Sequence, residues 1–264
     1  MSGDGKWALV TGASSGIGKA LAFEFAGGGF NVFLTGRSGT ALAEVAAECM
    51  RRYGIETEIL SADLSSEGGV DGLIAVLVSK PYRYEVLVNN AGFGVYGDFA
   101  SSPIEANIQL LNVQLVAALK LTRAMLPDML RRGGGRILNV ASVYSFSPVP
   151  LQSVYAASKS FLLSFSSSLE NELRGTGVTV TVFCPGVTQT AFRSRAQITE
   201  RSAKSGMTAE AAAHIAYIET LRGRRLVVPG FVNRLFVLVA RVVPVGALTR
   251  LVRFINRRRG QVHS

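Results

Sequence analysis

The sequence predicts one α/β domain, in which a doubly wound parallel sheet of about seven strands carries helices on both faces. Short β-branched runs alternate with longer helical patterns over the first two thirds of the chain, which is typical of successive βαβ units. A chain of 264 residues with 48% apolar residues can bury one large core but is too short for two ordinary domains.

Seven segments are predicted as strands because each is a short β-branched or apolar run bounded by turn residues. In chain order they are ALV from residue 8, NVFLTG from 31, TEILSAD from 57, VLVNNAG from 86, RILNVAS from 136, VTVTVFCPG from 178 and RRLVVPG from 224. The helical patterns between them are GKALAFEFAGGG, GTALAEVAAECMRRYG, VDGLIAVLVSK, ANIQLLNVQLVAALKLTRAMLPDMLRR and the run after Tyr155. Ligands of such a sheet bind beyond the carboxyl ends of its strands, where the strand order reverses.

The stretch TGASSGIG, residues 11–18, directly follows the first predicted strand and opens the first predicted helix. Its glycines permit a tight turn and let the backbone approach a pyrophosphate, which the amides and positive end of the helix favour. A glycine loop alone often only turns a chain, but this strand and helix around it predict a dinucleotide site. The predicted contacts are Gly12, Ser14, Ser15, Gly16, Ile17 and Gly18.

The end of the second predicted strand bears on which dinucleotide binds. An acid there would hold the ribose 2′-hydroxyl of NAD(H), but the chain has Gly36 followed by Arg37. A guanidinium can bind a 2′-phosphate through two hydrogen bonds, so NADP(H) is predicted over NAD(H). The alternative is that Arg37 is a solvated surface arginine.

The next two strands are predicted to end at the same edge of the sheet. Asp63, with Leu64 beside it, ends the third strand, where a carboxylate can accept a hydrogen bond from the adenine amino group. The fourth strand ends in NNAG, which places Asn90, Ala91 and Gly92 among the predicted cofactor contacts.

Ser142, Tyr155 and Lys159 are the candidate chemical groups. Ser142 ends the fifth predicted strand, and Tyr155 and Lys159 lie four positions apart, on one face of a predicted helix. A free phenol has a pKa of about 10, and one positive charge about 4 Å away supplies roughly the 4 kcal/mol needed to bring it near 7. The ordinary alternative is that the tyrosine packs and the lysine extends to solvent.

With TGASSGIG, NNAG, Ser142, YAASK and CPGVTQT in order over residues 6–193, the chain resembles the classical short-chain dehydrogenase/reductase family. The resemblance implies a Rossmann-type fold, a nicotinamide cofactor, hydride transfer between a carbonyl and an alcohol, and a homodimer or homotetramer. It implies that Tyr155 is the general acid/base, that Ser142 orients the substrate, and that Lys159 binds the ribose and lowers the tyrosine pKa. It also places Pro185, Gly186 and Thr190 on the carboxamide side of the nicotinamide, with Thr188 among the cofactor contacts.

The chain departs from the family at one catalytic position. The family often has a catalytic asparagine in the helix before the fifth strand, and counting back from TRAMLP puts Gln114 there, while the nearby asparagine is Asn112. Two residues apart on a helix differ by about 200°, so both cannot face the site. The sequence leaves the choice open.

Mostly apolar residues flank the predicted catalytic segments. They are Phe93, Tyr144, Phe146, Val149, Pro150, Leu151 and Phe192. As a substrate wall they predict an apolar carbonyl compound, such as a 3-oxoacyl thioester, a steroid or another lipid-like ketone, although core packing explains each of them equally well. A non-catalytic NADP-binding regulatory or scaffold protein is the alternative function, and the intact Ser142, Tyr155 and Lys159 argue against it.

Residues 1–230 are predicted as the dinucleotide-binding and catalytic domain, and residues 231–264 as a basic amphipathic helical extension. Ten of the 28 basic residues and one of the 18 acidic residues lie from Glu219 onward. The extension could pack on its own protein or a partner subunit, cover the site, or lie on an anionic membrane. Its longest uncharged run, 235–240, is too short to span a bilayer, and no pattern supports nucleic-acid binding.

The remaining composition predicts a cytoplasmic protein without a metal site. The N-terminal stretch has neither the pattern of a signal peptide nor that of a spanning helix. Cys49 and Cys184 lie in unrelated contexts, which suits a reducing compartment, and His214 and His263 form no metal-ligand cluster with them.

Overall fold

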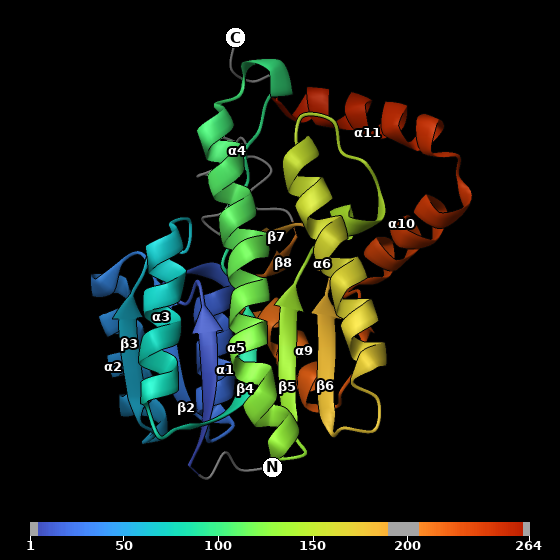
Figure 1. Cartoon of the computed structure of the whole chain (residues 1–264). Helices are drawn as coiled ribbons and strands as arrows, with labels where there is room; N and C mark the ends of the chain where they lie inside the picture. The colour runs from blue at the N-terminus through green and yellow to red at the C-terminus, as the bar shows by residue number, and fades with distance from the viewer. Residues whose placement is uncertain (1–4, 190–205, 261–264) are drawn as a thin grey trace.

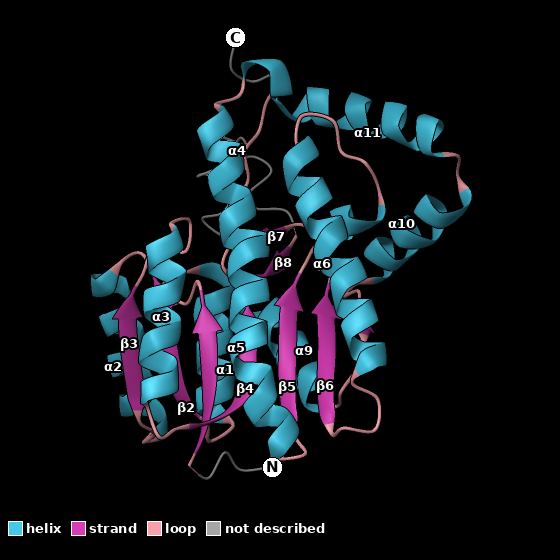
Figure 2. Cartoon of the chain, viewed as in Figure 1, coloured by secondary structure: helices cyan, strands magenta, loops and turns pink. Residues whose placement is uncertain are grey.

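A computed structural model of the chain describes residues 5–189 and 206–260, with side chains as far as Phe254. Seven parallel strands form one sheet in the order β3-β2-β1-β4-β5-β6-β9, so the predicted doubly wound sheet is confirmed (Figure 2). The strands are β1 (Lys6–Thr11), β2 (Asn31–Gly36), β3 (Thr57–Ser61), β4 (Arg83–Asn89), β5 (Gly135–Val140), β6 (Val178–Phe183) and β9 (Leu226–Val227). The order reverses between β1 and β4, which creates the expected binding crevice beyond their carboxyl ends. A separate pair joins β7 (Thr188–Gln189) to β8 (Met207–Thr208).

Helices cover both faces of the sheet (Figure 1). One face carries α1 (Gly16–Gly27), α2 (Gly39–Tyr53) and α9 (Ala209–Leu221), and the other carries α3 (Glu67–Ser79), α5 (Ala117–Arg131) and α6 (Ser153–Glu172). Alternate residues of each strand supply the two cores. In β1, Ala8 and Val10 face the first core, whereas Trp7 and Leu9 face the second.

The long segment before β5 is one continuous helical run with a change of geometry in its middle. It comprises α4 (Ile104–Leu111), a single π-helical stretch η2 (Asn112–Val116) and then α5. A π turn adds a residue to the turn and so shifts the side chains beside it. This is the stretch that contains both Asn112 and Gln114.

The C-terminal extension consists of two helices, α10 (Phe231–Val242) and α11 (Val245–Gly260), with Pro244 between them (Figure 1). Its inner face packs on the domain, where Leu248 and Val252 form a small core with Val149 and Ala156. Among the described residues, no helix is both long enough and apolar enough to cross a membrane.

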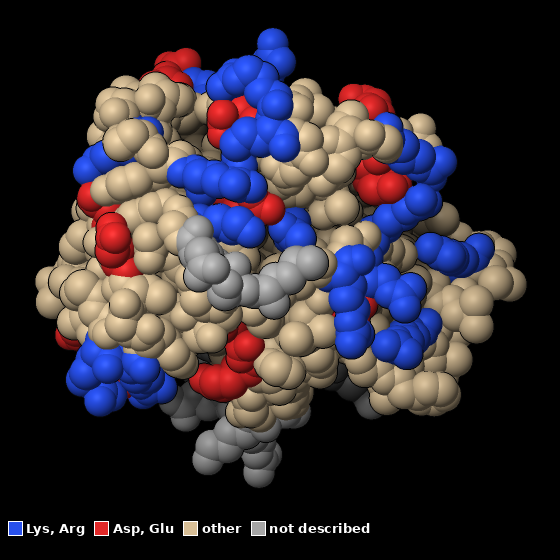
Figure 3. Space-filling view, turned by 90° about the horizontal axis from the view of Figure 1, so that it is seen from below, with Lys and Arg blue, Asp and Glu red and all other residues tan. Residues whose placement is uncertain are grey.

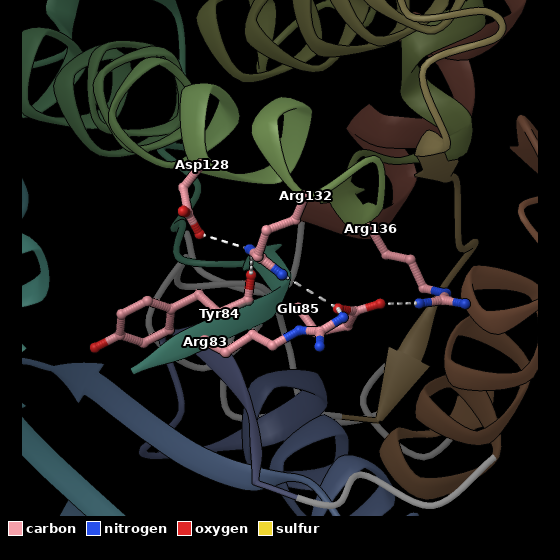
Figure 4. Close-up of polar contacts among 6 residues, drawn as sticks. All are labelled: Arg83, Tyr84, Glu85, Asp128, Arg132 and Arg136. Carbon is pink, nitrogen blue, oxygen red and sulfur yellow. Dashed lines mark hydrogen bonds and ion pairs between the residues drawn. The ribbon is translucent and has the colours of Figure 1, made fainter. Parts of the chain in front are cut away.

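At the opposite end of the sheet, where the strands begin, one buried carboxylate gathers several arginines (Figure 4). Glu85 in β4 lies 2.8 Å from Arg136 and 3.4 Å from both Arg132 and Arg83. Arg132 also donates to the carbonyl of Tyr84 at 2.8 Å. Figure 3 views the molecule from this end and shows lysines and arginines spread over much of its surface.

Candidate active site

A cavity of about 690 Å³ lies at the crevice where the strand order reverses. Nearly all the predicted site residues line it, from both the cofactor and the chemical segments. They are Gly12, Ser14, Ser15, Gly16, Ile17, Arg37, Asp63, Leu64, Asn90, Ala91, Gly92, Ser142, Tyr155, Lys159, Pro185, Gly186 and Thr188. Gly18 does not line the cavity, and Thr190 lies outside the described residues.

The glycine loop has a backbone that other residues would distort. Gly12 and Gly16 have φ angles of +66° and +56°, in the left-handed region that glycine adopts without strain. A Cβ on Gly18 would lie 2.2 Å from the carbonyl oxygen of Gly12, so Gly18 lets the start of α1 pack on the loop. Gly18 therefore permits the close packing of α1 on the glycine loop and does not line the cavity, whereas the sequence predicted it as a cofactor contact.

The loop after β4 is fastened to the glycine loop by hydrogen bonds. The amides of Asn90 and Ala91 both donate to Thr11 Oγ1 at 3.0 Å, and Asn90 Nδ2 donates to the Thr11 carbonyl at 2.9 Å. These contacts fix the two loops on either side of the crevice. The first amides of a helix lack carbonyl partners one turn earlier, so the start of α1, before the Lys19 amide donates to the Ser15 carbonyl at 3.2 Å, can offer donors to an anion.

Arg37 and Asp63 lie at the cofactor end of the cavity. Ser65 donates to Asp63 Oδ1 from its backbone and from its hydroxyl, at 2.9 and 2.7 Å. These hydrogen bonds, together with the smaller effect of the Arg37 charge, hold the pKa of the Asp63 carboxyl below its usual range. Arg37 is exposed and follows Gly36, so a cation and no acid occupies the end of β2. A dinucleotide fits this end of the cavity, which offers it one exposed guanidinium as a donor and one carboxylate as an acceptor.

Ser142 and Tyr155 meet at the other end of the cavity. Ser142 begins the short 3-10 helix η3 (Val143–Phe146), and its Oγ accepts from the Tyr144 amide at 3.2 Å. Burial raises the pKa of the Tyr155 phenol well above its usual range, and a hydrogen bond with Ser142 acts in the opposite direction. Tyr144 packs edge-on against Tyr155.

Lys159 lies on the same face of α6 as Tyr155, one turn further along the helix. Its Nζ donates to the carbonyl of Val140 at 2.9 Å and lies 5.6 Å from the centre of the Tyr155 ring. Burial lowers the pKa of Lys159 to about 7. The predicted proximity is thus present, but burial has the largest effect on both pKa values and moves each toward the neutral form.

The π turn separates the two candidates for the fourth catalytic residue. Gln114 is 2% exposed, and its Nε2 donates to the Phe93 carbonyl at 2.7 Å while its Oε1 accepts from Ser158 Oγ at 3.3 Å. Asn112 Nδ2 instead donates to the Ser65 carbonyl at 2.9 Å. Gln114 therefore connects the loop after β4 to the helix of Tyr155, and Asn112 is directed toward the start of α3.

The substrate wall differs from the sequence prediction. Phe93 and Tyr144 line the cavity, but Phe146, Val149, Pro150 and Leu151 do not, and Phe192 lies outside the described residues. Val149 and Phe146 face the extension instead: Val149 packs on α11, and Arg241 lies over the Phe146 ring. The extension supplies wall residues that the sequence did not assign, namely Val232, Asn233, Phe236 and Val252. The apolar pattern of the extension was visible in the sequence, but the direction of each face was not.

The family described as short chain dehydrogenase matches residues 6–201 of the chain. A ketoacyl reductase, HetN, from Nostoc sp. is 35% identical over 189 residues, which cover 71% of this chain and 66% of that protein. A human very-long-chain 3-oxoacyl-CoA reductase is 36% identical over 187 residues, which cover 69% of this chain and 59% of that protein. The chain thus spans less than two thirds of either relative.

Solved structures match over almost the whole chain. A short-chain dehydrogenase from Sphingobium yanoikuyae in complex with NADPH has a TM-score of 0.82 and 30% identity, with 93% of this chain and 94% of that one covered. A 7β-hydroxysteroid dehydrogenase has a TM-score of 0.84 and 27% identity, with 94% and 96% covered.

Proposed function

Because the chain belongs to the short-chain dehydrogenase family, we propose that it transfers a hydride between NADP(H) and the carbonyl or alcohol group of an apolar small molecule. The observation that carries the proposal is that Ser142, Tyr155 and Lys159 line the same cavity as the glycine loop. One ligand that reaches both ends would therefore present its reactive ring to the three side chains.

In this proposal the bound nicotinamide supplies the hydride in reduction and accepts it in oxidation. The Tyr155 hydroxyl donates a proton to the carbonyl oxygen in reduction, while Ser142 donates a hydrogen bond to the same oxygen as negative charge develops on it. Lys159 binds the ribose and places a positive charge near the phenol, which lowers the cost of the phenolate that remains. Burial opposes a charge on either residue alone. A protonated Lys159 is therefore needed to stabilise the Tyr155 phenolate as it forms.

The preference for NADP(H) is supported by the end of β2. Arg37 would pair with the 2′-phosphate, Asp63 would accept from the adenine amino group, and the amides at Gly16 and Ile17 would face the pyrophosphate. The Sphingobium yanoikuyae structure holds NADPH at 30% identity, which favours the same choice. Arg37→Ala should weaken NADPH binding more than NADH binding in a fluorescence titration, and equal losses would contradict the assignment.

An apolar, lipid-like ketone is the proposed class of substrate. Tyr96, Tyr144, Val232, Phe236 and Val252 give the chemical end of the cavity a largely apolar wall. The named activities of the relatives, on ketoacyl, 3-oxoacyl-CoA and hydroxysteroid compounds, support the same class.

A homodimer through α4, α5 and α6 is also proposed. These helices, with the π-helical stretch η2 between α4 and α5, expose large apolar side chains that do not line the cavity: Ile104, Ile108, Val116, Leu119 and Phe161. Burying them between two copies would remove this apolar area from water. Sedimentation equilibrium of the full chain measures the oligomeric state, and a monomer at micromolar concentration would contradict the assignment.

Turnover is tested by NADPH consumption over a panel of apolar ketones, with Tyr155→Phe as the paired variant. Loss of the acid should lower kcat by on the order of 100-fold or more. Cofactor binding without turnover of any ketone would favour the non-catalytic scaffold, and turnover unaffected by Tyr155→Phe would remove the catalytic assignment.

A further inference from the structure

Helix α10 is apolar on two sides, and only one of them is used by the domain. Its inner side holds Phe236 and Val237 against the protein. On its other side, six exposed apolar residues form what we call the outer stripe: Phe231, Val232, Leu235, Leu238, Val239 and Val242. Phe231 and Val242, at the two ends, are 81% and 78% exposed.

The outer stripe is continuous along the helix. Its members occur at i, i+1, i+4, i+7, i+8 and i+11, which places all six within about 120° of one another at 100° per residue. A helix whose apolar arc extends well beyond the face that its own domain buries is ordinarily covered there by protein or lipid. An exposed stripe of this length therefore indicates a surface that something covers.

The helices of the extension carry positive charge and no acid. Arg234 and Arg241 are exposed on α10, and Arg250 and Arg253 are exposed on α11. The sequence has no acidic residue after Glu219, and within the described part of the chain no ion pair joins residues 231–254 to an acid. Apolar area on helices whose exposed arginines have no acidic partner complements an apolar layer beneath negatively charged groups. Arg234 also donates to the Val228 carbonyl and Arg241 lies over the Phe146 ring, and neither contact neutralises its charge.

We propose that the outer stripe of α10 docks on the surface of an anionic lipid bilayer. The apolar side chains enter the boundary between headgroups and acyl chains, and the arginines bind lipid phosphates. A second copy of this chain is a poorer occupant, because a two-fold contact through α10 would place arginine against arginine without an acid to pair them.

The outer stripe begins at the cavity. Val232 is both exposed and part of the cavity wall, and Phe236 lies one turn further along the inner side. A ketone dissolved in the bilayer would therefore reach the site beside Val232 without crossing bulk water. This route rests on the proposed function, whereas the membrane contact does not.

Co-sedimentation of the full chain with vesicles tests the contact. The unaltered chain should bind vesicles of three parts phosphatidylcholine to one part phosphatidylglycerol more tightly than vesicles of phosphatidylcholine alone. Leu238→Ser with Val242→Ser should weaken binding on the order of tenfold or more, because it removes apolar area that enters the lipid. Both residues lie outside the cavity wall and the buried core, so the substitutions leave the site and the fold intact. Arg250→Gln with Arg253→Gln should weaken binding to the anionic vesicles on the order of tenfold or more.

Matched controls remove the same chemistry elsewhere on the surface. Val78→Ser with Met50→Ser removes two exposed apolar side chains, and Arg51→Gln with Arg131→Gln removes two exposed charges. Neither pair should change binding by more than about twofold, since surface charge far from the contact is screened. Equal losses in controls and test variants would overturn the proposal, as would binding that survives both test pairs.

A reporter at the stripe gives a second measurement that does not depend on affinity. Both native cysteines are buried, and burial raises their pKa values to about 11 and 12, so a new surface thiol can be labelled selectively. A polarity-sensitive dye on Val242→Cys should shift to the blue when anionic vesicles are added, and the same dye on Val78→Cys should not. A blue shift that instead follows protein concentration without lipid would assign the stripe to a second copy and refute the lipid contact. Vesicle binding without turnover of any ketone would leave the contact intact and refute only the proposed function.

Discussion

The buried ammonium of Lys159 should make the active site a source of instability, and Lys159→Met should therefore stabilise the fold while it impairs turnover. Burial lowers the pKa of this lysine from 10.5 to about 7. At 1.36 kcal/mol per unit, that shift amounts to about 5 kcal/mol against the charged form. Methionine fills a similar volume without the charge, but it leaves the Val140 carbonyl without its donor at a cost of about 1–3 kcal/mol. The net gain at and below pH 7 is then about 2–4 kcal/mol.

The gain should depend on pH in a defined way. Between the folded pKa near 7 and the unfolded value of 10.5, the unfolded chain binds a proton that the folded chain does not, so the stability of the native sequence rises with pH. Below about pH 7 both states bind the proton and the full penalty applies. The advantage of Lys159→Met should therefore be greatest at and below about pH 7 and should shrink toward pH 10.

Urea unfolding at constant temperature, without added nucleotide, measures this difference at about pH 6, 8 and 9.5. Lys120→Met is the control, because Lys120 forms a surface pair with Asp71 and its loss should cost less than about 1 kcal/mol at each pH. A stability difference between Lys159→Met and the native chain that stays constant with pH would refute the reasoning.

Three further outcomes follow from packing around the crevice and at the far end of the sheet. Glu85→Gln should lower the free energy of unfolding by about 2–3 kcal/mol, because it leaves the arginines beside a neutral group. Arg83→Gln should cost under about 0.5 kcal/mol, since Arg83 lies 3.4 Å from Glu85 and is half exposed. Similar urea midpoints for the two variants would contradict this. Gly18→Ala should weaken NADPH binding by about tenfold or more in a fluorescence titration, because the new methyl group displaces the glycine loop, and unchanged affinity would show that the loop yields. Gln114→Leu should lower kcat/KM by about tenfold or more, because it removes the contacts of Gln114 to the loop after β4 and to α6, and Gln114→Asn should recover part of the loss. An equal loss in Asn112→Ala would show that Gln114 and Asn112 do not differ in their role at the site.

Features that depend on local sequence were predicted well. Gly12 and Gly16 stand where the turn requires positive φ, and the strands ended near the predicted turn residues, because both follow from a few consecutive positions. Gly18 shows where this stops: its glycine is required by the carbonyl of Gly12, six residues earlier, so its role appears only once the loop has closed.

Other features depended on contacts between distant segments. The direction of the Gln114 side chain could not be predicted, because it depends on the π turn, which the periodicity of the sequence does not reveal. The wall residues Val232 and Phe236 required the direction in which the extension returns to the domain. Proximity of Tyr155 and Lys159 was predictable from their spacing, but the direction of their pKa shifts was set by burial, which many residues of the fold produce together.

The unfavourable features of the molecule gather next to its chemistry. Leu151, four residues before Tyr155, has a φ of +69°, a left-handed conformation that costs a non-glycine residue about 1–2 kcal/mol, and its carbonyl accepts from the Gly97 amide at 2.9 Å. The buried charge of Lys159 adds a larger cost a few residues later. Both lie on the side of the molecule where the strands end, whereas the two large cores that stabilise the fold lie along the faces of the sheet. Because the cores can hold these residues in place without their own contacts being disturbed, substitutions that relieve the strain at residue 151 or the charge at residue 159 should raise stability and lower turnover together.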